Sequence, residues 1–163
     1  MSELEIENLI ASIKSAEVDY VCWTGGEPLM QWEAIKEVVK NTPSVCHHIE
    51  TNGDLIKDAE FADELMAELG YVAISPKVLE VAKRVSILFM KHNSTDFDIK
   101  VVTDLKDEGV DMIPFATCIM PLTSFEPAKD ADLNQEVWNY CVKNNIKLCP
   151  RFQIMVWGKE RGI

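Results

Sequence analysis

Short apolar segments alternate with amphipathic segments along the whole chain, and this alternation most constrains the fold. Apolar runs rich in Val and Ile predict strands at residues 18–23, 44–50, 71–75, 97–102, 116–121 and 146–150. Apolar residues at helical spacing predict helices at 2–16, 31–40, 58–69, 78–90 and 133–144. Strands that alternate with helices are typical of βαβ units on a parallel sheet. The sequence therefore predicts an α/β fold.

The predicted strands read as continuous apolar runs, which is expected when both faces of a parallel sheet are covered. Six such strands suit an open sheet or a partial β/α barrel of mostly parallel strands. Residues 103–115 show neither pattern and are predicted to be an irregular connection. No repeat, linker or low-complexity tract divides the chain, so residues 1–163 are predicted to form a single domain.

Charge and hydropathy exclude some partners. The net charge of −11 disfavours nucleic acid and anionic membranes, because both attract positively charged proteins. No apolar run approaches the roughly 18 residues of a membrane span. The first ten residues, MSELEIENLI, are acidic and lack the basic start of a secretory signal. These features predict a cytoplasmic protein without a membrane or nucleic-acid partner.

Small and polar residues follow the predicted strands, where ligands bind in parallel α/β folds. The sequences at these ends include TGGEP (24–28), ETNG (50–53) and SPK (75–77). The paired glycines of TGGEP remove Cβ and would let the backbone approach a ligand directly. A double glycine is also common in a plain turn, and no Lys-Ser or Lys-Thr follows as in a P-loop. TGGEP alone leaves both interpretations open.

The three motifs together, with the ending LCPRFQIMVWGKERGI, resemble the radical S-adenosylmethionine superfamily, and within it the family of 7-carboxy-7-deazaguanine synthases. The resemblance extends over the whole chain and implies a partial β/α barrel of radical S-adenosylmethionine type. It also implies S-adenosylmethionine as cofactor. The positions that match the family's cofactor-binding motifs are Gly25, Gly26, Glu27, Pro28, Glu50, Asn52, Ser75 and Lys77.

Two further positions are expected to face the substrate. Thr24 precedes the glycines at the floor of the site. Gln153 stands where the family tends to carry a histidine, and glutamine keeps hydrogen-bonding capacity but cannot become cationic. The resemblance assigns no catalytic residue to this chain.

The cysteines depart from the family pattern. The family holds a [4Fe-4S] cluster with three cysteines spaced CxxxCxxC, and its magnesium-holding residue lies beside them. Here the cysteines stand at 22, 46, 118, 141 and 149, without that spacing. We therefore expect no cluster ligand set, no metal ligand and no activity from this chain alone, and we expect the thiols to be buried packing residues.

The full family reaction is the ring contraction of 6-carboxy-5,6,7,8-tetrahydropterin to 7-carboxy-7-deazaguanine, a step of queuosine and deazapurine biosynthesis. By resemblance, the expected ligand is a small pterin-like substrate. One alternative is a cluster-free, non-catalytic module that binds S-adenosylmethionine or a pterin. Another is a β/α-barrel hydrolase or lyase whose motifs match by chance. Two protein partners stay open: a second copy in a homodimer, or a separate N-terminal segment that carries the cluster.

Overall fold

Six parallel strands form one sheet whose spatial order, β1-β2-β3-β4-β5-β6, follows the order in the sequence. The structure is a computed structural model that describes residues 1–93 and 95–158. The strands are β1 (Tyr20–Trp23), β2 (Cys46–Thr51), β3 (Tyr71–Ile74), β4 (Phe97–Thr103), β5 (Cys118–Pro121) and β6 (Lys147–Leu148). This confirms the predicted α/β fold with parallel strands and is consistent with a partial, open barrel.

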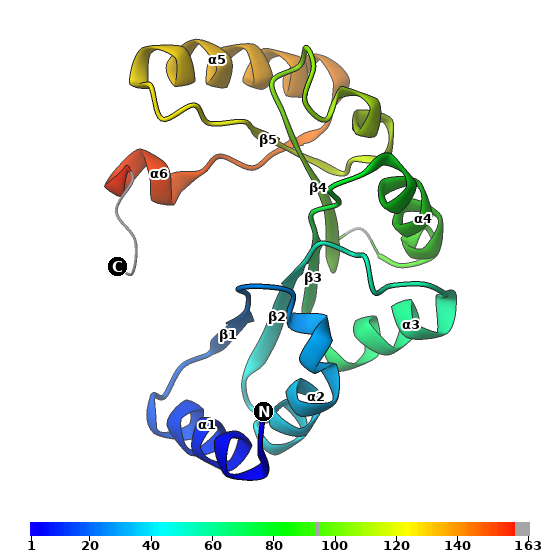
Figure 1. Cartoon of the computed structure of the whole chain (residues 1–163), viewed down its shortest axis with the longest axis vertical. Coiled ribbons are helices and arrows are strands. Elements are labelled where there is room, and N and C mark those ends of the chain that lie inside the picture. The colour runs from blue at the N-terminus through cyan, green and yellow to red at the C-terminus, as the bar shows by residue number, and fades with distance from the viewer. Residues whose placement is uncertain (94, 159–163) are drawn as a thin grey trace.

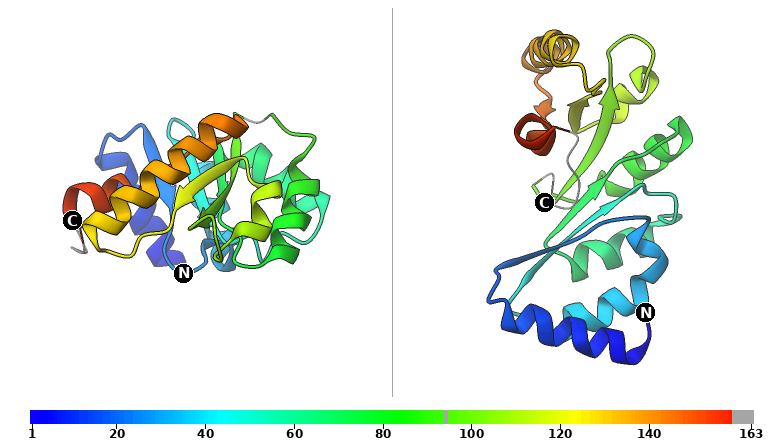
Figure 2. Two further views of the ribbon diagram at one scale, coloured as in Figure 1. Left: turned by 90° about the horizontal axis from the view of Figure 1, so that it is seen from above. Right: turned by 60° about the vertical axis from the view of Figure 1, so that its left-hand side comes forward.

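The helices are α1 (Glu3–Ser15), α2 (Trp32–Asn41), α3 (Ala59–Glu68), α4 (Leu79–Phe89), α5 (Pro127–Asn144) and α6 (Phe152–Trp157), with 3-10 turns η1 (Pro28–Gln31) and η2 (Val110–Phe115). In Figure 1, α2, α3 and α4 lie along the outer side of the curved sheet. The inner side faces the opening between β1 and α6, and Figure 2 shows the same arrangement from two other directions. No helix within the described ranges is long and apolar enough to cross a membrane.

Local signals explain where several helices begin. Ser2 caps α1 in a reciprocal capping box with Glu5, and the Asp58 carboxylate caps α3 by accepting from the Phe61 N–H at 2.9 Å. The prediction for α5 was wrong at its start, because the helix begins at Pro127 and not at residue 133. Proline suits the first helical position, and the first turns of α5 are polar and exposed, so they add no apolar period. The helix α6 was not predicted.

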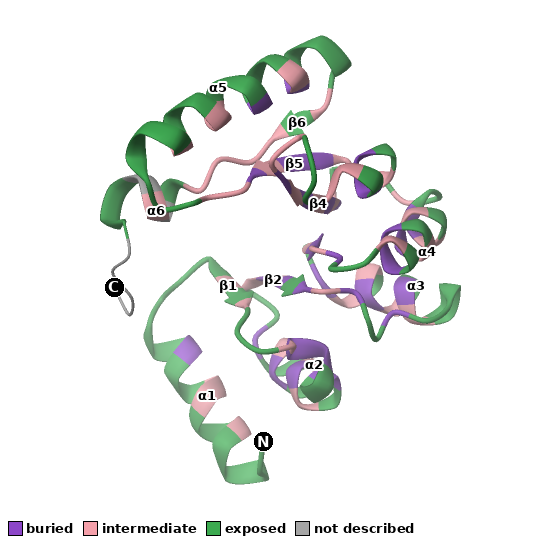
Figure 3. Cartoon of the chain, turned by 45° about the horizontal axis from the view of Figure 1, so that its top comes forward, coloured by how far each residue is buried: buried purple, intermediate pink, exposed green. Residues whose placement is uncertain are grey.

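The apolar core lies between the sheet and the helices on its outer side. Side chains of α2, α3 and α4 such as Ile35, Leu65 and Val85 are buried in one cluster with Ile49 and Val72 of the strands. A second cluster joins α5 and η2 to β4 and β5. Figure 3 shows this burial where helices meet the sheet, while α1 and α5 keep broad exposed faces.

The inner face of the sheet differs from the sequence-based expectation that both faces would be covered. Along β4, burial alternates strictly: Ile99 and Val101 are buried toward the helices, whereas Asp98, Lys100 and Val102 are only partly buried. The helices α2, α3 and α4 do not cover this inner face (Figure 1). The carboxyl ends of the strands are consequently accessible there to a ligand.

Candidate functional site

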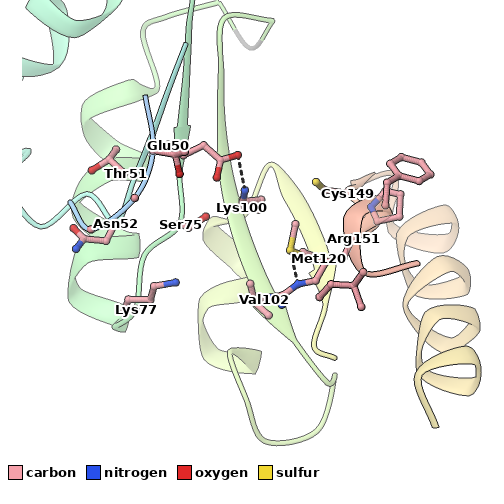
Figure 4. Close-up of a pocket in the computed structure, with 16 residues that line it drawn as sticks. Glu50, Thr51, Asn52, Ser75, Lys77, Lys100, Val102, Met120, Cys149 and Arg151 are labelled. Atoms are coloured by element: carbon pink, nitrogen blue, oxygen red, sulfur yellow. Dashed lines mark hydrogen bonds and ion pairs between the residues drawn. The ribbon is translucent and has the colours of Figure 1, made fainter. Parts of the chain in front are cut away.

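A cavity of about 600 Å³ opens at the carboxyl ends of the strands on the inner face of the sheet (Figure 4). Its volume is in the range of small-molecule sites in proteins. The lining residues come from the carboxyl-terminal parts of all six strands and from the segments that follow them. They are Thr24, Gly25, Gly26, Glu50, Thr51, Asn52, Ser75, Lys77, Lys100, Val102, Met120, Cys149, Pro150, Arg151, Phe152 and Ile154.

Three motifs picked out in the sequence meet at this cavity. TGGEP contributes its first three residues, ETNG contributes Glu50, Thr51 and Asn52, and SPK contributes Ser75 and Lys77. They meet because the carboxyl ends of neighbouring parallel strands lie at the same edge of a sheet. Gln153 belongs to α6, but its side chain lies outside the described residues, so its predicted contact with substrate stays a prediction.

The glycine turn needs glycine for its backbone conformation. Gly25 and Gly26 have φ angles of +85° and +55°, in the left-handed region that side chains disfavour. A Cβ built on either residue would meet no atom within 4 Å. The turn therefore presents uncrowded backbone to the cavity, and a side chain there would strain the turn without colliding with the protein.

Glu27 and Pro28 do not line the cavity. The Glu27 carboxylate accepts from the Thr51 hydroxyl at 2.6 Å, from the Asn52 N–H at 2.8 Å and from the Leu29 N–H at 3.1 Å. Glu27 thus ties the glycine turn to the ETNG turn and caps η1, which begins at Pro28. In this structure both residues shape the wall of the cavity, and their predicted contact with a cofactor stays a prediction.

An ion pair crosses the floor of the cavity. Lys100 Nζ lies 3.4 Å from Glu50 Oε1, and the Lys100 side chain is only 13% exposed. Figure 4 shows the two side chains reaching toward each other from β4 and β2. The sequence predicted a strand at residues 97–102 but did not single out Lys100, because its ion-pair partner is fifty residues away in the chain.

A second polar network supports the inner face beneath the cavity. The Asp98 carboxylate accepts from Tyr71 Oη at 2.5 Å, from Thr117 Oγ1 at 2.6 Å and from Lys147 Nζ at 3.0 Å. Burial and the hydrogen bond to Asp98 raise the pKa of the Tyr71 hydroxyl, so it acts as a neutral donor. This network joins β3, β4, β5 and β6 and fixes their relative positions below the ligand-accessible edge.

The expectation that all cysteines would be buried is wrong for three of the five. Cys22 is exposed, and Cys46 and Cys149 are partly buried. Cys149 lines the cavity. A hydrogen bond from the Cys118 thiol lowers the pKa of Cys149, assisted by the Lys100 ammonium, while burial opposes this shift.

The family's metal groups do not fit the described side chains. Within residues 1–93 and 95–158, no group of three or more His, Cys, Asp or Glu side chains is arranged to hold a metal ion. Cys118 and Cys149 interact, but a cluster needs three thiolates on one site. By contrast, the cavity offers hydroxyl, amide, carboxylate and ammonium groups beside open backbone. That set can bind a zwitterionic head group such as that of S-adenosylmethionine.

Comparison with known proteins gives two distant relatives, and no protein-family model matches the chain. The chain is 25% identical over 176 residues to 7-carboxy-7-deazaguanine synthase of Thermoplasma acidophilum, covering 99% of this chain and 78% of that protein. It is 24% identical over 174 residues to 7-carboxy-7-deazaguanine synthase of Pyrobaculum aerophilum, covering 98% and 75%. The chain is therefore distantly related to 7-carboxy-7-deazaguanine synthases.

Proposed function

We propose that the cavity is the ligand site of a 7-carboxy-7-deazaguanine synthase-like protein and binds S-adenosylmethionine together with a small carboxylated pterin. One observation carries this proposal: the three motifs that resemble the radical S-adenosylmethionine superfamily line the same cavity. The distant relationship to two 7-carboxy-7-deazaguanine synthases also supports it.

Each wall of the cavity has a role in this proposal. The open backbone of Gly25 and Gly26 receives the methionyl head group of S-adenosylmethionine. Ser75 and Asn52 supply a hydroxyl and an amide that can donate to or accept from the ligand, and Lys77 supplies a cation. Thr24 lies beside the glycines, where it can contact the pterin. The chain thus positions two ligands in one enclosure.

We infer the reaction class from the distant relationship. In the superfamily, S-adenosylmethionine bound to a reduced cluster supplies a radical that removes a hydrogen atom from the substrate. Because the described side chains do not fit a cluster, we assign this chain the binding, orientation and shielding of ligands. We propose that it does not catalyse the ring contraction alone and that the cluster ligands come from another segment or partner.

A second candidate function is a cluster-free module that binds S-adenosylmethionine or a pterin without catalysis. The observation that favours it is the built cavity beside cysteines that form no three-thiolate site among the described residues. An upstream reading frame or neighbouring gene with CxxxCxxC would favour the synthase over this module. Cytoplasmic location and the lack of a nucleic-acid partner stay predictions from the sequence.

Ligand titration tests the proposed function. We expect S-adenosylmethionine, added to isotope-labelled protein, to shift the backbone amide signals of Gly25, Gly26 and Ser75. Pterin-6-carboxylate, a stable aromatic analogue of the substrate, is expected to shift signals of the same cavity. Amides of α1 serve as the internal control, because that helix lies away from the cavity (Figure 1). If neither ligand shifts the cavity signals at millimolar concentration, the proposed function is wrong.

A further inference from the structure

Arg151 is a cation at the edge of the cavity whose hydrogen-bond partner carries no charge. It follows β6 and lines the cavity, and its side chain is partly buried. Its Nε–H donates to the sulfur of Met120 at 3.1 Å, and Figure 4 shows this contact at the edge of the cavity. A thioether is a weak acceptor. Among residues 1–93 and 95–158, no carboxylate forms an ion pair with this guanidinium.

The lack of a carboxylate partner is informative because acidic residues are abundant. The chain has 27 Asp and Glu residues against 16 Lys and Arg. Arg151 also borders a second cavity of about 340 Å³, whose lining includes Asp130. The Asp130 carboxylate instead accepts from the Thr123 hydroxyl at 2.6 Å and from the Ser124 N–H at 2.7 Å. Placing a guanidinium in a partly buried position without an anion costs free energy unless a ligand compensates.

The other charges of the cavity do not neutralise Arg151. Glu50 pairs with Lys100 on the floor. Lys77 lines the cavity from the end of β3 and forms no ion pair with a described residue. In Figure 4, Lys77 and Arg151 lie on opposite sides of the cavity, with Lys100 between them. Even if Cys149 ionises, its thiolate lies beside Lys100, so the cavity retains an excess of positive charge.

We infer that Arg151 is a specificity-determining residue whose guanidinium binds the carboxylate of the pterin-like substrate. This inference rests on the proposed function and names the group that recognises the acid. A guanidinium suits the role because it can donate two parallel hydrogen bonds to the two oxygens of a carboxylate. The cation at the β6 end of the cavity thereby selects an acidic ring system over the same ring with a neutral substituent.

The substrate is a better source of this carboxylate than S-adenosylmethionine. The methionyl head group is assigned to the glycine turn after β1, at the other edge of the sheet from β6. S-adenosylmethionine also carries a net positive charge, since its sulfonium and ammonium outnumber its single carboxylate. A cavity with surplus cations therefore favours a second ligand that brings negative charge.

A matched pair of ligands tests the inference by calorimetry. Pterin-6-carboxylate and 6-hydroxymethylpterin share the ring and differ in the acidic group. We expect the native chain to bind the acid about tenfold or more tightly than the alcohol. Arg151→Gln should remove that preference and leave the affinities for the alcohol and for S-adenosylmethionine unchanged. Arg151→Lys should retain part of the preference, because it keeps the charge but loses the planar fork.

Lys83→Gln is the control, since it removes one exposed positive charge from α4 outside the cavity. Equal binding of both pterins by the native chain would overturn the inference while the proposed function stands. An Arg151→Gln variant that weakens both pterins equally, or S-adenosylmethionine alone, would also overturn it. If the native chain binds neither pterin, the proposed substrate itself is wrong. Circular dichroism shows whether each variant folds, and the native comparison of acid with alcohol does not depend on the variants.

Discussion

The Glu27 carboxylate accepts a hydrogen bond from the Thr51 hydroxyl at 2.6 Å, across 24 residues of sequence. This contact joins the turn after β1 to the turn after β2. The same carboxylate also accepts from the backbone N–H of Asn52, a residue that lines the cavity. Glu27 thus determines how two walls of the cavity stand relative to each other.

Glu27→Ala should loosen both turns and destabilise the fold. Hydrogen bonds to a charged group each contribute about 1.5–3 kcal/mol, and partial replacement by water should leave a loss of about 2–3 kcal/mol in the free energy of unfolding. Urea denaturation measures this loss. Glu33→Ala is the control, because the Glu33 side chain is 85% exposed and should change stability by less than about 0.5 kcal/mol. Equal losses of unfolding free energy in the two variants would show that Glu27 does not hold the two turns together.

Gly26→Val should abolish binding of S-adenosylmethionine while the chain still folds. The φ angle of +55° places a β-branched residue in a disfavoured conformation that costs about 1–2 kcal/mol. The new side chain would also lie where the ligand is proposed to contact the backbone of the turn. For the native chain we expect a Kd in the high micromolar to millimolar range, about −4 to −6 kcal/mol, measured by calorimetry.

Gly158→Val is a matched control for that experiment. Gly158 also has a positive φ, at +62°, and a Cβ there would meet no atom within 4 Å, but it does not line the first cavity. The control should show comparable strain and unchanged binding. If native and Gly26→Val proteins bind S-adenosylmethionine equally well, the glycine turn is only a structural turn.

Stability should fall as the pH drops from about 7.5 to about 5.5, because His47 must be neutral in the folded chain. Trp23 Nε1–H donates to His47 Nδ1 at 3.2 Å, so the remaining proton lies on Nε2, next to the Thr42 hydroxyl at 2.9 Å. Burial lowers the pKa of His47. The unfolded chain takes up a proton below about pH 6.5, and the folded chain resists it, which favours unfolding in acid.

The free energy of unfolding measured by urea at several pH values checks this dependence. His47→Gln removes the titrating group, so the slope between pH 7.5 and 5.5 should become shallower even if the variant is less stable overall. An unchanged slope in His47→Gln would assign the pH dependence to other groups.

Anaerobic reconstitution of the chain with iron and sulfide should yield no stoichiometric cluster. The physical reason is that the described cysteines include the Cys118–Cys149 pair but no third thiolate on the same site. Iron content per chain and visible absorption measure the outcome. About four irons per chain with a cluster absorption band would show that the cysteines can be brought together.

The succession of strands and helices, and the edge of the sheet at which the motifs meet, can be predicted from local patterns in the sequence. Helical spacing and caps such as Ser2 and Asp58 are local signals, readable within a few residues. Parallel strands place their carboxyl ends at one edge, so the TGGEP, ETNG and SPK turns could be assigned to one site before any coordinates. The start of α5 escaped prediction because its exposed first turns add no apolar period.

Which side chains are available to a ligand depends on contacts between distant parts of the folded chain. Glu27 belongs to the cofactor motif in sequence, yet its carboxylate is occupied by Thr51, Asn52 and Leu29. Arg151 lies in the ending LCPRFQIMVWGKERGI but was not predicted as a site residue, yet it lines the cavity with a thioether as partner. The physical reason is that hydrogen-bond and ion-pair partners are selected by strand register and sheet curvature. These bring together residues far apart in the chain, and no local pattern records them.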